Sequence, residues 1–289
     1  MKRLCILATV LILALSIVSC TAPEQGGGEL KILLLADFHY DSDVAAISKV
    51  LGDIKENVEY DFMICHGDIV NNSKDLVAGF FRVFDEHAIL PPKYIATGNH
   101  DYDKVTGEWV LIDMEYKLYQ SFELENRDDI LWLVLADEAF GDPNIFSEEQ
   151  LSWFKNRLQY AEDNSLIVFV SSHWPMPGTT EQSDTEGYHI EYGDADLIEN
   201  MAGFENIQFW FSGHTHQRID QQTQIVEKDG VVHVNLGSIL PTRNKSSIPE
   251  WREIIIPNFG SRITIKDRNS QTEEWFATHT FKLKSALLK

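Results

Sequence analysis

Apolar and polar residues follow two different patterns along the chain, and the pattern changes near residue 216. Up to that point, short apolar runs typical of buried strands alternate with segments of helical periodicity. Helices are predicted from Val44 to Val58 and from Leu76 to Ala88. Ser147 can cap a third helix, with Gln150 as its capping-box partner. The strands predicted in this part are Leu30–Ala36, Asp61–Cys65, Tyr94–Thr97, Ile130–Ala136, Leu166–Ser171 and Phe209–Ser212.

After His216 the pattern predicts strands without helices. An alternating β/α part followed by strands indicates a layered α/β fold with two packed sheets. No linker-like break divides residues 30–289, so we expect one domain there, in which the strands of residues 245–289 complete the second sheet. The late strands are predicted at Ile219–Val226, Val231–Asn235, Arg252–Ile256, Arg262–Lys266 and Trp275–Leu283.

The first residues resemble an export signal. Lys2 and Arg3 precede an apolar stretch that is shorter than the roughly 20 residues of a membrane-spanning helix. The stretch ends in Ile17-Val18-Ser19-Cys20, which resembles a bacterial lipoprotein signal; an ordinary signal peptide with a chance cysteine is the alternative. We therefore expect a signal peptide at 1–19, a flexible tether at 20–29, and an exported protein held in the cell envelope by a lipid on Cys20.

Composition excludes some classes of function. Of the 289 residues, 44% are hydrophobic and 11% aromatic, which is too many for a disordered chain. Asp and Glu number 45 against 24 Lys and Arg, giving a formal charge of −21, and loss of Lys2 and Arg3 with a signal peptide would make it more negative. Binding to nucleic acid by charge needs clustered basic residues, so we expect no nucleic-acid partner. A small phosphate ester stays possible.

Metal-ligating residue types follow five of the predicted strands. A lone Asp can cap a helix and a lone His can pack in a core, but five such strand ends in one chain are hard to explain in that way. Sites in open α/β sheets form at the carboxyl ends of strands. In extended chain, residues i and i+2 face the same side, so Asp37 and His39 can converge on one ion, and His214 and His216 can flank two. Oxygen and imidazole ligands suit Zn, Mn or Fe.

In order along the chain, these segments resemble the five blocks of the calcineurin-like metallophosphoesterase superfamily. The helix predicted after Ser147, and Asn235-Leu236-Gly237-Ser238 followed by Arg243, also resemble segments of that family. The resemblance spans about residues 30–245 and implies a four-layer α/β/β/α sandwich of two mixed sheets with a dinuclear metal centre. The blocks are Asp37-x-His39, Gly67-Asp68, Gly98-Asn99-His100-Asp101, His173 and Gly213-His214-x-His216.

The resemblance also implies a role for each residue. Asp68 would bridge two divalent ions together with a water or hydroxide, and that hydroxide would attack phosphorus. His100 would not bind metal; it would stabilise the transition state or protonate the leaving oxygen, and Asp101 would orient His100 or its turn. Two anionic ligands, two divalent ions and one hydroxide leave the centre at about +1, which suits a phosphate. One ion would be held by Asp37, His39, Asp68 and His216, and the other by Asp68, Asn99, His173 and His214.

The sequence leaves the roles of several residues outside the blocks undecided. In the polar segment 178–193, Tyr188 and His189 could bind substrate, or the segment could be a solvated acidic loop. Trp174 could line the pocket or only pack. His66 is expected to be structural. Asn71 stands where purple acid phosphatases place a tyrosine ligand, so a purple Fe(III) enzyme is not expected.

The leading hypothesis is a hydrolase of ester bonds that acts on a small phosphomonoester or phosphodiester and carries two divalent ions of Mn, Zn or Fe. A catalytically inert surface-binding protein on the same fold is one alternative, and a nuclease of the same superfamily is another. The acidic composition and the lack of a basic strip with interleaved aromatic residues disfavour the nuclease. Contact with a membrane is expected only through the N-terminal lipid.

Overall fold

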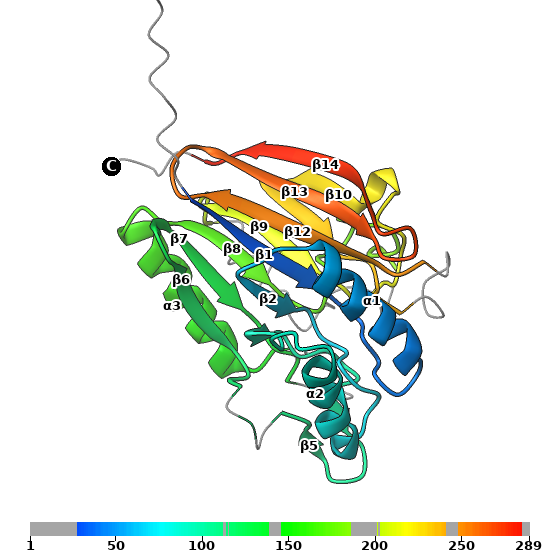
Figure 1. The fold of residues 1–289 in the computed structure, drawn as a ribbon. Coiled ribbons are helices and arrows are strands. Elements are labelled where there is room, and N and C mark those ends of the chain that lie inside the picture. Colours follow the sequence, from blue (N-terminus) through cyan, green and yellow to red (C-terminus); the bar gives the residue numbers. More distant parts are fainter. Residues whose placement is uncertain are drawn as a thin grey trace, which may run out of the picture.

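The computed structural model describes residues 28–111, 114, 116–138, 146–185, 201, 203–240 and 248–284. The predictions for the signal peptide, Cys20, Tyr188, His189 and Arg243 lie outside these residues. Within them the chain forms two six-stranded sheets, a small two-stranded one and three α-helices (Figure 1). None of the helices described is long and apolar enough to cross a bilayer.

The first sheet has the strand order β14-β13-β12-β1-β2-β3. β1, β2 and β3 run parallel, while β12 pairs antiparallel with the other side of β1. The prediction that the last strands complete the second sheet is therefore wrong: they extend the first one. Without them the buried strand β1 would be an unpaired edge. The bounds are β1 Glu29–Leu35, β2 Phe62–Cys65, β3 Tyr94–Ile95, β12 Glu250–Pro257, β13 Arg262–Asn269 and β14 Glu274–Lys282.

The second sheet has the order β10-β11-β9-β8-β7-β6. Its four inner strands are parallel, and β6 and β10 lie antiparallel at its edges. The strand predicted from Ile219 begins only at Ile225, because a 3₁₀ turn at Gln222–Gln224 precedes it. The bounds are β6 Gln120–Leu124, β7 Arg127–Val134, β8 Ile167–Ser171, β9 Ile207–Ser212, β10 Ile225–Lys228 and β11 Val231–Asn235; the small sheet joins β4 Tyr102–Asp103 to β5 Glu108–Trp109.

Alternating side chains of the strands build four layers. In β1, Leu33 and Leu35 pack toward the helices α1 (Val44–Asn57) and α2 (Val77–Glu86), whereas Ile32 and Leu34 pack between the sheets. In β7, Leu131 packs toward α3 (Glu148–Asp163) on the far side. The order is thus helices, sheet, sheet, helix, as Figure 1 shows, which confirms the predicted α/β/β/α sandwich.

The helix predicted after Ser147 forms, but its cap differs from the prediction. Ser147 Oγ accepts a hydrogen bond from Gln150 N at 3.1 Å, as a cap should. The return bond comes from Glu138, whose Oε2 accepts from Ser147 N at 3.1 Å. The Gln150 amide is buried and instead pairs with both backbone groups of Ala136 beyond the end of β7. Gln150 therefore joins α3 to the sheet and does not complete a capping box.

Candidate metal centre

The loops after β1, β2, β8 and β9 meet at one end of the sandwich. Asp37 N donates to Gly67 O at 3.0 Å, which joins two loops of the first sheet. Gly213 N donates to His173 O at 3.0 Å, which joins two loops of the second. His214 N donates to the Asp37 carboxylate at 3.1 Å and so ties the two pairs together. Polar side chains from both sheets therefore face one another at these carboxyl ends.

Four of the predicted ligands form a first group. The ligand atoms of Asp37, His39, Asp68 and His216 all lie within 4.8 Å of one another. His216 Nε2 is 3.0 Å from Asp37 Oδ1 and 3.2 Å from His39 Nε2. His39 Nε2 is 3.4 Å from Asp68 Oδ2. Two carboxylates and two imidazoles thus converge on one point, as the resemblance implies for one ion.

A second group shares Asp68 with the first. Its ligand atoms in Asp68, His173 and His214 also lie within 4.8 Å of one another. His173 Nε2 is 3.0 Å from His214 Nδ1 and 3.2 Å from the amide oxygen of Asn99. It is 3.5 Å from Asp68 Oδ2, the same oxygen that faces His39 in the first group. One carboxylate oxygen therefore faces both groups, which is the position that a bridging ligand takes.

In two of the histidines, His39 and His173, a hydrogen bond at Nδ1 leaves Nε2 available to a metal. His173 Nδ1 donates to the carbonyl of His66 at 2.7 Å, so its Nε2 keeps a lone pair. The Asn71 amide nitrogen donates to Asp41 Oδ1 at 2.6 Å, which turns its oxygen to His39 Nδ1 at 2.7 Å. His39 Nδ1 therefore donates as well, and its Nε2 is free to bind a metal. Asn71 thus supports a ligand and is not itself a member of either group.

The charge of the site also fits divalent cations. Asp37 and Asp68 are fully buried, and two buried carboxylates this close need positive charge for balance. Burial lowers the pKa of His39 to about 4, which keeps its ring neutral at pH 7. Burial raises the pKa of Asp68, but the positive charge that His173 can carry outweighs that effect and holds it below its usual range. Burial lowers the pKa of His173 and of His216 too, but there Asp68 and Asp37 outweigh it and raise both above the ordinary value. Ionised carboxylates and imidazoles suit a borderline ion such as Zn or Mn.

The sequence argument assumed that the chain is extended at Asp37 and His39 and at His214 and His216. That assumption is wrong, because the backbone turns at each of these residues. Asp68 and the four candidate ligands in the first and last blocks all have a positive φ, in the left-handed region. Such a conformation costs a side-chain-bearing residue about 1–2 kcal/mol. It turns the chain directly after each strand, and strain of this kind is concentrated at functional sites. The φ angles are 58° at Asp37, 41° at His39, 53° at Asp68, 67° at His214 and 51° at His216.

Two glycines let the groups come this close. A Cβ on Gly98 would lie 2.5 Å from Asp68 Oδ1 and 2.8 Å from His173 Cδ2. A Cβ on Gly213 would lie 2.8 Å from Asp37 Oδ2 and 2.6 Å from the Ala36 side chain. Any side chain at either position would displace a predicted ligand. The sequence predicts that other groups come close to the backbone at these glycines. In the structure those groups include side chains of the candidate ligands.

His100 and Asp101 have different surroundings, although both were predicted as catalytic. The His100 ring lies beside the first group, with its centroid 4.9 Å from that of His39. Asp101 is fully buried, and its carboxylate accepts hydrogen bonds from the backbone N–H groups of Asp68 at 2.8 Å and Gly98 at 2.9 Å. It also accepts from Ile69 N at 2.8 Å. Asp101 therefore holds the backbone of its own turn and of the Asp68 turn, which is a positioning role, and its part in catalysis stays a prediction.

Trp174 packs against a predicted ligand. Its ring centroid lies 3.8 Å from that of His214, and its indole N–H donates to Asp137 Oδ2 at 2.9 Å. These contacts agree with the packing alternative. The indole is half-buried and borders the second group, so its role in substrate binding stays a prediction. Of the other substrate candidates, Tyr188 and His189 lie outside the described residues.

The segment Asn235–Ser238 supports the site in a way that its sequence did not reveal. Asn235 Nδ2 donates to Gly213 O at 3.0 Å, and Ser238 Oγ donates to Asp37 O at 3.3 Å. The segment thus holds the backbone carbonyl groups of Asp37 in the first block and Gly213 in the last block. The motif was noticeable in the sequence, but its partners lie about 20 and 200 residues away and only the fold brings them together.

The loop after His216 is held by a buried acid. Glu250 Oε2 accepts from Ile219 N at 2.9 Å, and Arg252 Nη2 donates to Ile219 O at 3.1 Å. Burial raises the pKa of Glu250 from its ordinary value of 4.5 to about 7. Because the folded state binds this proton more tightly than the unfolded state, its ionisation lowers the free energy of unfolding between about pH 4.5 and pH 7.

Glu250→Gln should therefore stabilise the protein relative to wild type, and increasingly so as the pH rises. Glutamine keeps an oxygen for Ile219 N but cannot ionise. Melting temperatures measured from pH 4.5 to pH 8 should be equal at the acidic end, diverge up to about pH 7 and stay apart above it. A constant difference over the whole range would contradict the assigned pKa shift.

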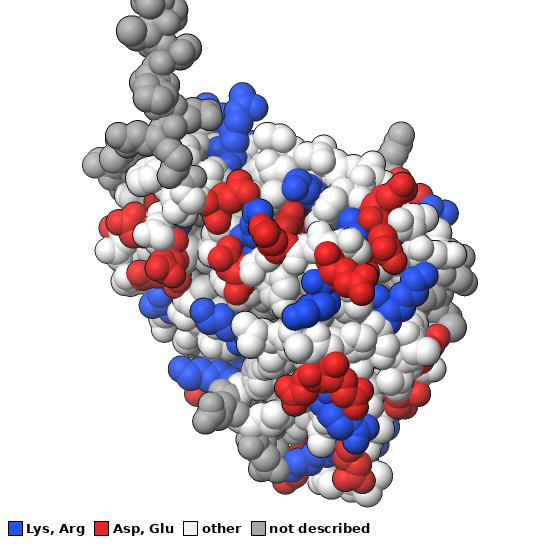
Figure 2. Space-filling model, viewed as in Figure 1, with Lys and Arg blue, Asp and Glu red and all other residues white. Residues whose placement is uncertain are grey.

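The surface agrees with the composition. On the face shown in Figure 2, Asp and Glu side chains are interspersed with Lys and Arg, and no continuous basic strip crosses it. A long nucleic acid would find no row of cations on this face.

A family model and one relative match most of this chain, and a second relative matches about a third of it. The family model of calcineurin-like phosphoesterases matches residues 30–218. A 3',5'-cyclic adenosine monophosphate phosphodiesterase of Haemophilus influenzae is 24% identical over 268 residues, which cover 84% of this chain and 92% of the relative. A human manganese-dependent ADP-ribose/CDP-alcohol diphosphatase is 31% identical over 97 residues, or 34% of this chain and 26% of that protein.

Solved structures share the fold at low sequence identity. A dimetal phosphatase of Danio rerio superposes with a TM-score of 0.63 at 13% identity, covering 88% of this chain and 99% of that one. A purple acid phosphatase of yellow lupin gives 0.62 at 12% identity, covering 89% of this chain and 54% of that one. The α/β/β/α sandwich and the order of the five blocks agree with the family whose model matches residues 30–218. The chain therefore belongs to the calcineurin-like phosphoesterase family.

Proposed function

We propose that this protein hydrolyses a small phosphomonoester or phosphodiester at a centre of two divalent metal ions. The observation that carries the proposal is the shared oxygen of Asp68, which lies 3.4 Å from His39 Nε2 in one ligand group and 3.5 Å from His173 Nε2 in the other. Its relatives support the same reaction class, since the two described above are named as a phosphodiesterase and a diphosphatase.

Each of the two ligand groups would hold one ion. Divalent ions bound there would activate a water for attack on phosphorus and neutralise charge on the phosphoryl oxygens. Asn99 completes the second set, because its amide oxygen lies 3.2 Å from His173 Nε2. The first set is Asp37, His39, Asp68 and His216, and the second is Asp68, Asn99, His173 and His214.

His100 has the position of an acid or a transition-state donor. Its backbone N–H donates to Asp68 Oδ1 at 2.9 Å, which fixes the residue against the bridging carboxylate. Its ring stands edge-on to that of His39, at an interplanar angle of 79°. A substrate phosphate placed between the two groups would have this imidazole beside it. We assign His100 to protonation of the leaving oxygen or to stabilisation of the transition-state charge.

The substrate that we propose is small. The formal charge of −21 disfavours long polyanions, while the ions would provide positive charge only within the site. The relatives act, by their names, on 3',5'-cyclic AMP and on ADP-ribose or CDP-alcohols, so small nucleotide derivatives are the first substrates to examine. Cyclic AMP, ADP-ribose and a glycerophosphodiester form a suitable panel.

Hydrolysis of p-nitrophenyl phosphate and of its bis-ester tests the proposal. The purified protein should be inactive after chelation and regain turnover with Mn²⁺ or Zn²⁺. The ratio of the two rates indicates a monoesterase or a diesterase. A protein that binds no metal and shows no turnover would overturn the proposal. A protein that binds metal but hydrolyses neither compound nor any member of the panel would favour the inert binding protein.

We also propose that the chain is exported and carries a lipid on Cys20. The motif Ile17-Val18-Ser19-Cys20 supports this localisation. Mass spectrometry of the N-terminal peptide should find a diacylglycerol on Cys20 in a bacterial expression host, and Cys20→Ala should release the protein from the membrane fraction. An unmodified Cys20 would favour the ordinary signal peptide.

His100→Ala should lower kcat about 100- to 1,000-fold while leaving both metals bound. The reason is that the ring lies beside the ligand groups and contributes no atom to them. Metal content per chain and kcat on the bis-ester check the two parts separately. Loss of a metal in this variant would show that His100 is a ligand or supports one.

A further inference from the structure

A cleft lies at the end of the sandwich opposite the candidate metal centre. It has a volume of about 590 Å³ and is formed where β1 and β2 begin, by the segment leading into β3 and by the turn between β6 and β7. The candidate metal ligands follow the opposite ends of β1 and β2. Since β1 has seven residues, about 20 Å of strand separates the two sites.

Three aromatic side chains form one wall of the cleft. Tyr94 and Phe122 stack with their ring centroids 3.8 Å apart, and Phe62 stands at 80° to Tyr94 with centroids 5.8 Å apart. All three rings are half-buried, so part of their surface faces the opening. Leu90, on the rim, is 71% exposed. Exposed apolar surface of this kind is typical of a binding site.

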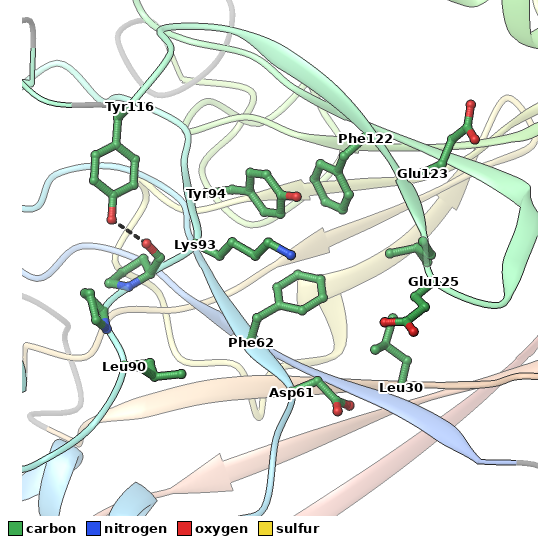
Figure 3. A pocket seen from close by; sticks show the side chains of 13 residues that line it. Leu30, Asp61, Phe62, Leu90, Lys93, Tyr94, Tyr116, Phe122, Glu123 and Glu125 are labelled. Carbon is green, nitrogen blue, oxygen red and sulfur yellow. Dashed lines mark hydrogen bonds between the residues drawn. The ribbon is translucent and has the colours of Figure 1, made fainter.

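A cation already lies on these rings. Lys93 Nζ is 5.0 Å from the centroid of Phe62 and 5.5 Å from that of Tyr94, which are cation–π distances. Figure 3 shows the Lys93 chain extended between Phe62 on one side and Tyr94 and Phe122 on the other. The negative faces of the rings are thus arranged to attract positive charge within the cleft.

The charged residues of the cleft have an excess of acid. Asp61, Glu123 and Glu125 are exposed carboxylates, and Lys93 is the one cation among the lining residues described. In Figure 3, Asp61 and Glu125 stand on the side toward which the Lys93 ammonium points. A phosphate or carboxylate would meet three like charges here, whereas an organic cation would meet complementary ones.

We propose that this cleft binds a choline-type alkylammonium group, which takes the place of the Lys93 ammonium on the rings of Phe62 and Tyr94. The methyl groups of such a ligand would contact the rings and Leu30, and Asp61 and Glu125 would balance its charge. The group could be free in solution or part of a lipid headgroup, because the chemistry that the cleft recognises is the same. The site is independent of the proposed hydrolysis.

Calorimetric titration with choline tests the proposal, with 3,3-dimethylbutan-1-ol as the uncharged ligand of the same shape. Choline should bind and the alcohol should bind at least threefold more weakly, since only the charge differs. Lys93→Met removes the resident cation and keeps the chain length, so it should tighten binding of choline. Tyr94→Leu and Glu125→Gln should each weaken it about threefold.

The matched control is Lys49→Met, which removes an exposed lysine of α1 outside the cleft and should leave the affinity unchanged. All variants should keep the circular dichroism spectrum and the cooperative thermal unfolding of wild type, which shows that they are folded. Failure of choline to bind, equal binding of the alcohol, or loss of binding in Lys93→Met would each overturn the proposal.

A competition experiment identifies the source of the group. The Cys20→Ala protein is used, because without a lipid it can reach a vesicle only through the cleft. Phosphatidylcholine vesicles that capture it and release it to free choline would place the site on a lipid surface. Choline binding without capture by vesicles would place the ligand in solution. Capture by phosphatidylglycerol vesicles in preference to phosphatidylcholine would contradict recognition of a cation.

Discussion

Asp68→Asn should remove both metals from the protein at micromolar concentrations and lower kcat/KM about a thousandfold or more, which corresponds to about 4 kcal/mol of transition-state stabilisation. The cause is the position of Asp68 Oδ2, which faces His39 Nε2 at 3.4 Å and His173 Nε2 at 3.5 Å. An asparagine has the same size but no charge, so it cannot balance two divalent ions. Metal analysis after gel filtration and bis-ester kinetics measure the two effects.

The control for this variant is Asp163→Asn, an exposed carboxylate at the end of α3, which should retain wild-type metal content and activity. An Asp68→Asn protein that still holds two metals per chain would contradict the assignment of Asp68 as the bridging ligand. Retention of one metal with loss of the other would assign Asp68 to a single ion.

Asp101→Ala should lower the free energy of unfolding by several kcal/mol. Its fully buried carboxylate accepts from the backbone N–H groups of Asp68, Ile69 and Gly98. Each buried donor left without a partner costs about 1–3 kcal/mol. Alanine leaves all three donors without this acceptor, so the midpoint of urea denaturation should lie far below that of wild type. The metals should also bind weakly, because the Asp68 turn is no longer held.

Asp101→Asn is the matched comparison. Burial raises the pKa of Asp101 to about 7, so a neutral side chain is tolerated better here than at an ordinary carboxylate. Asparagine keeps one oxygen for the backbone donors and should fall between wild type and alanine in stability. Equal stability of alanine and wild type would show that the turns hold without this side chain.

The hydrophobic pattern predicted most of the layers but not their pairing. β1, β8, β9 and β11 were expected within two residues of their observed bounds, because buried parallel strands are continuous apolar runs. β6 was not predicted: Gln-Ser-Phe-Glu-Leu alternates at a sheet edge and gains its partner, β7, only through the fold. The strands after residue 245 were predicted as strands, but which sheet they join depends on the open edge of β1.

The sequence motifs predicted the candidate ligands but not the residues that orient them. The resemblance supplied the ligand groups, and the structure brings all of their described members together. The residues that orient those ligands could not be predicted, because their contacts depend on tertiary distance. His66 supplies only its carbonyl to His173, and Asn71 faces His39 through an amide whose direction is fixed by Asp41. No local pattern in the sequence indicates such pairs.

The central claim is that this fold holds two metal ions that act together in phosphoester hydrolysis. The most direct test is a titration of the metal-free protein with Mn²⁺, in which bound metal per chain and hydrolysis of bis-(p-nitrophenyl) phosphate are followed together. The two ligand groups around Asp68 predict that binding ends at two ions per chain and that turnover reaches its maximum only when both are bound. Full activity at one ion per chain, or turnover that persists in chelator, would contradict this account.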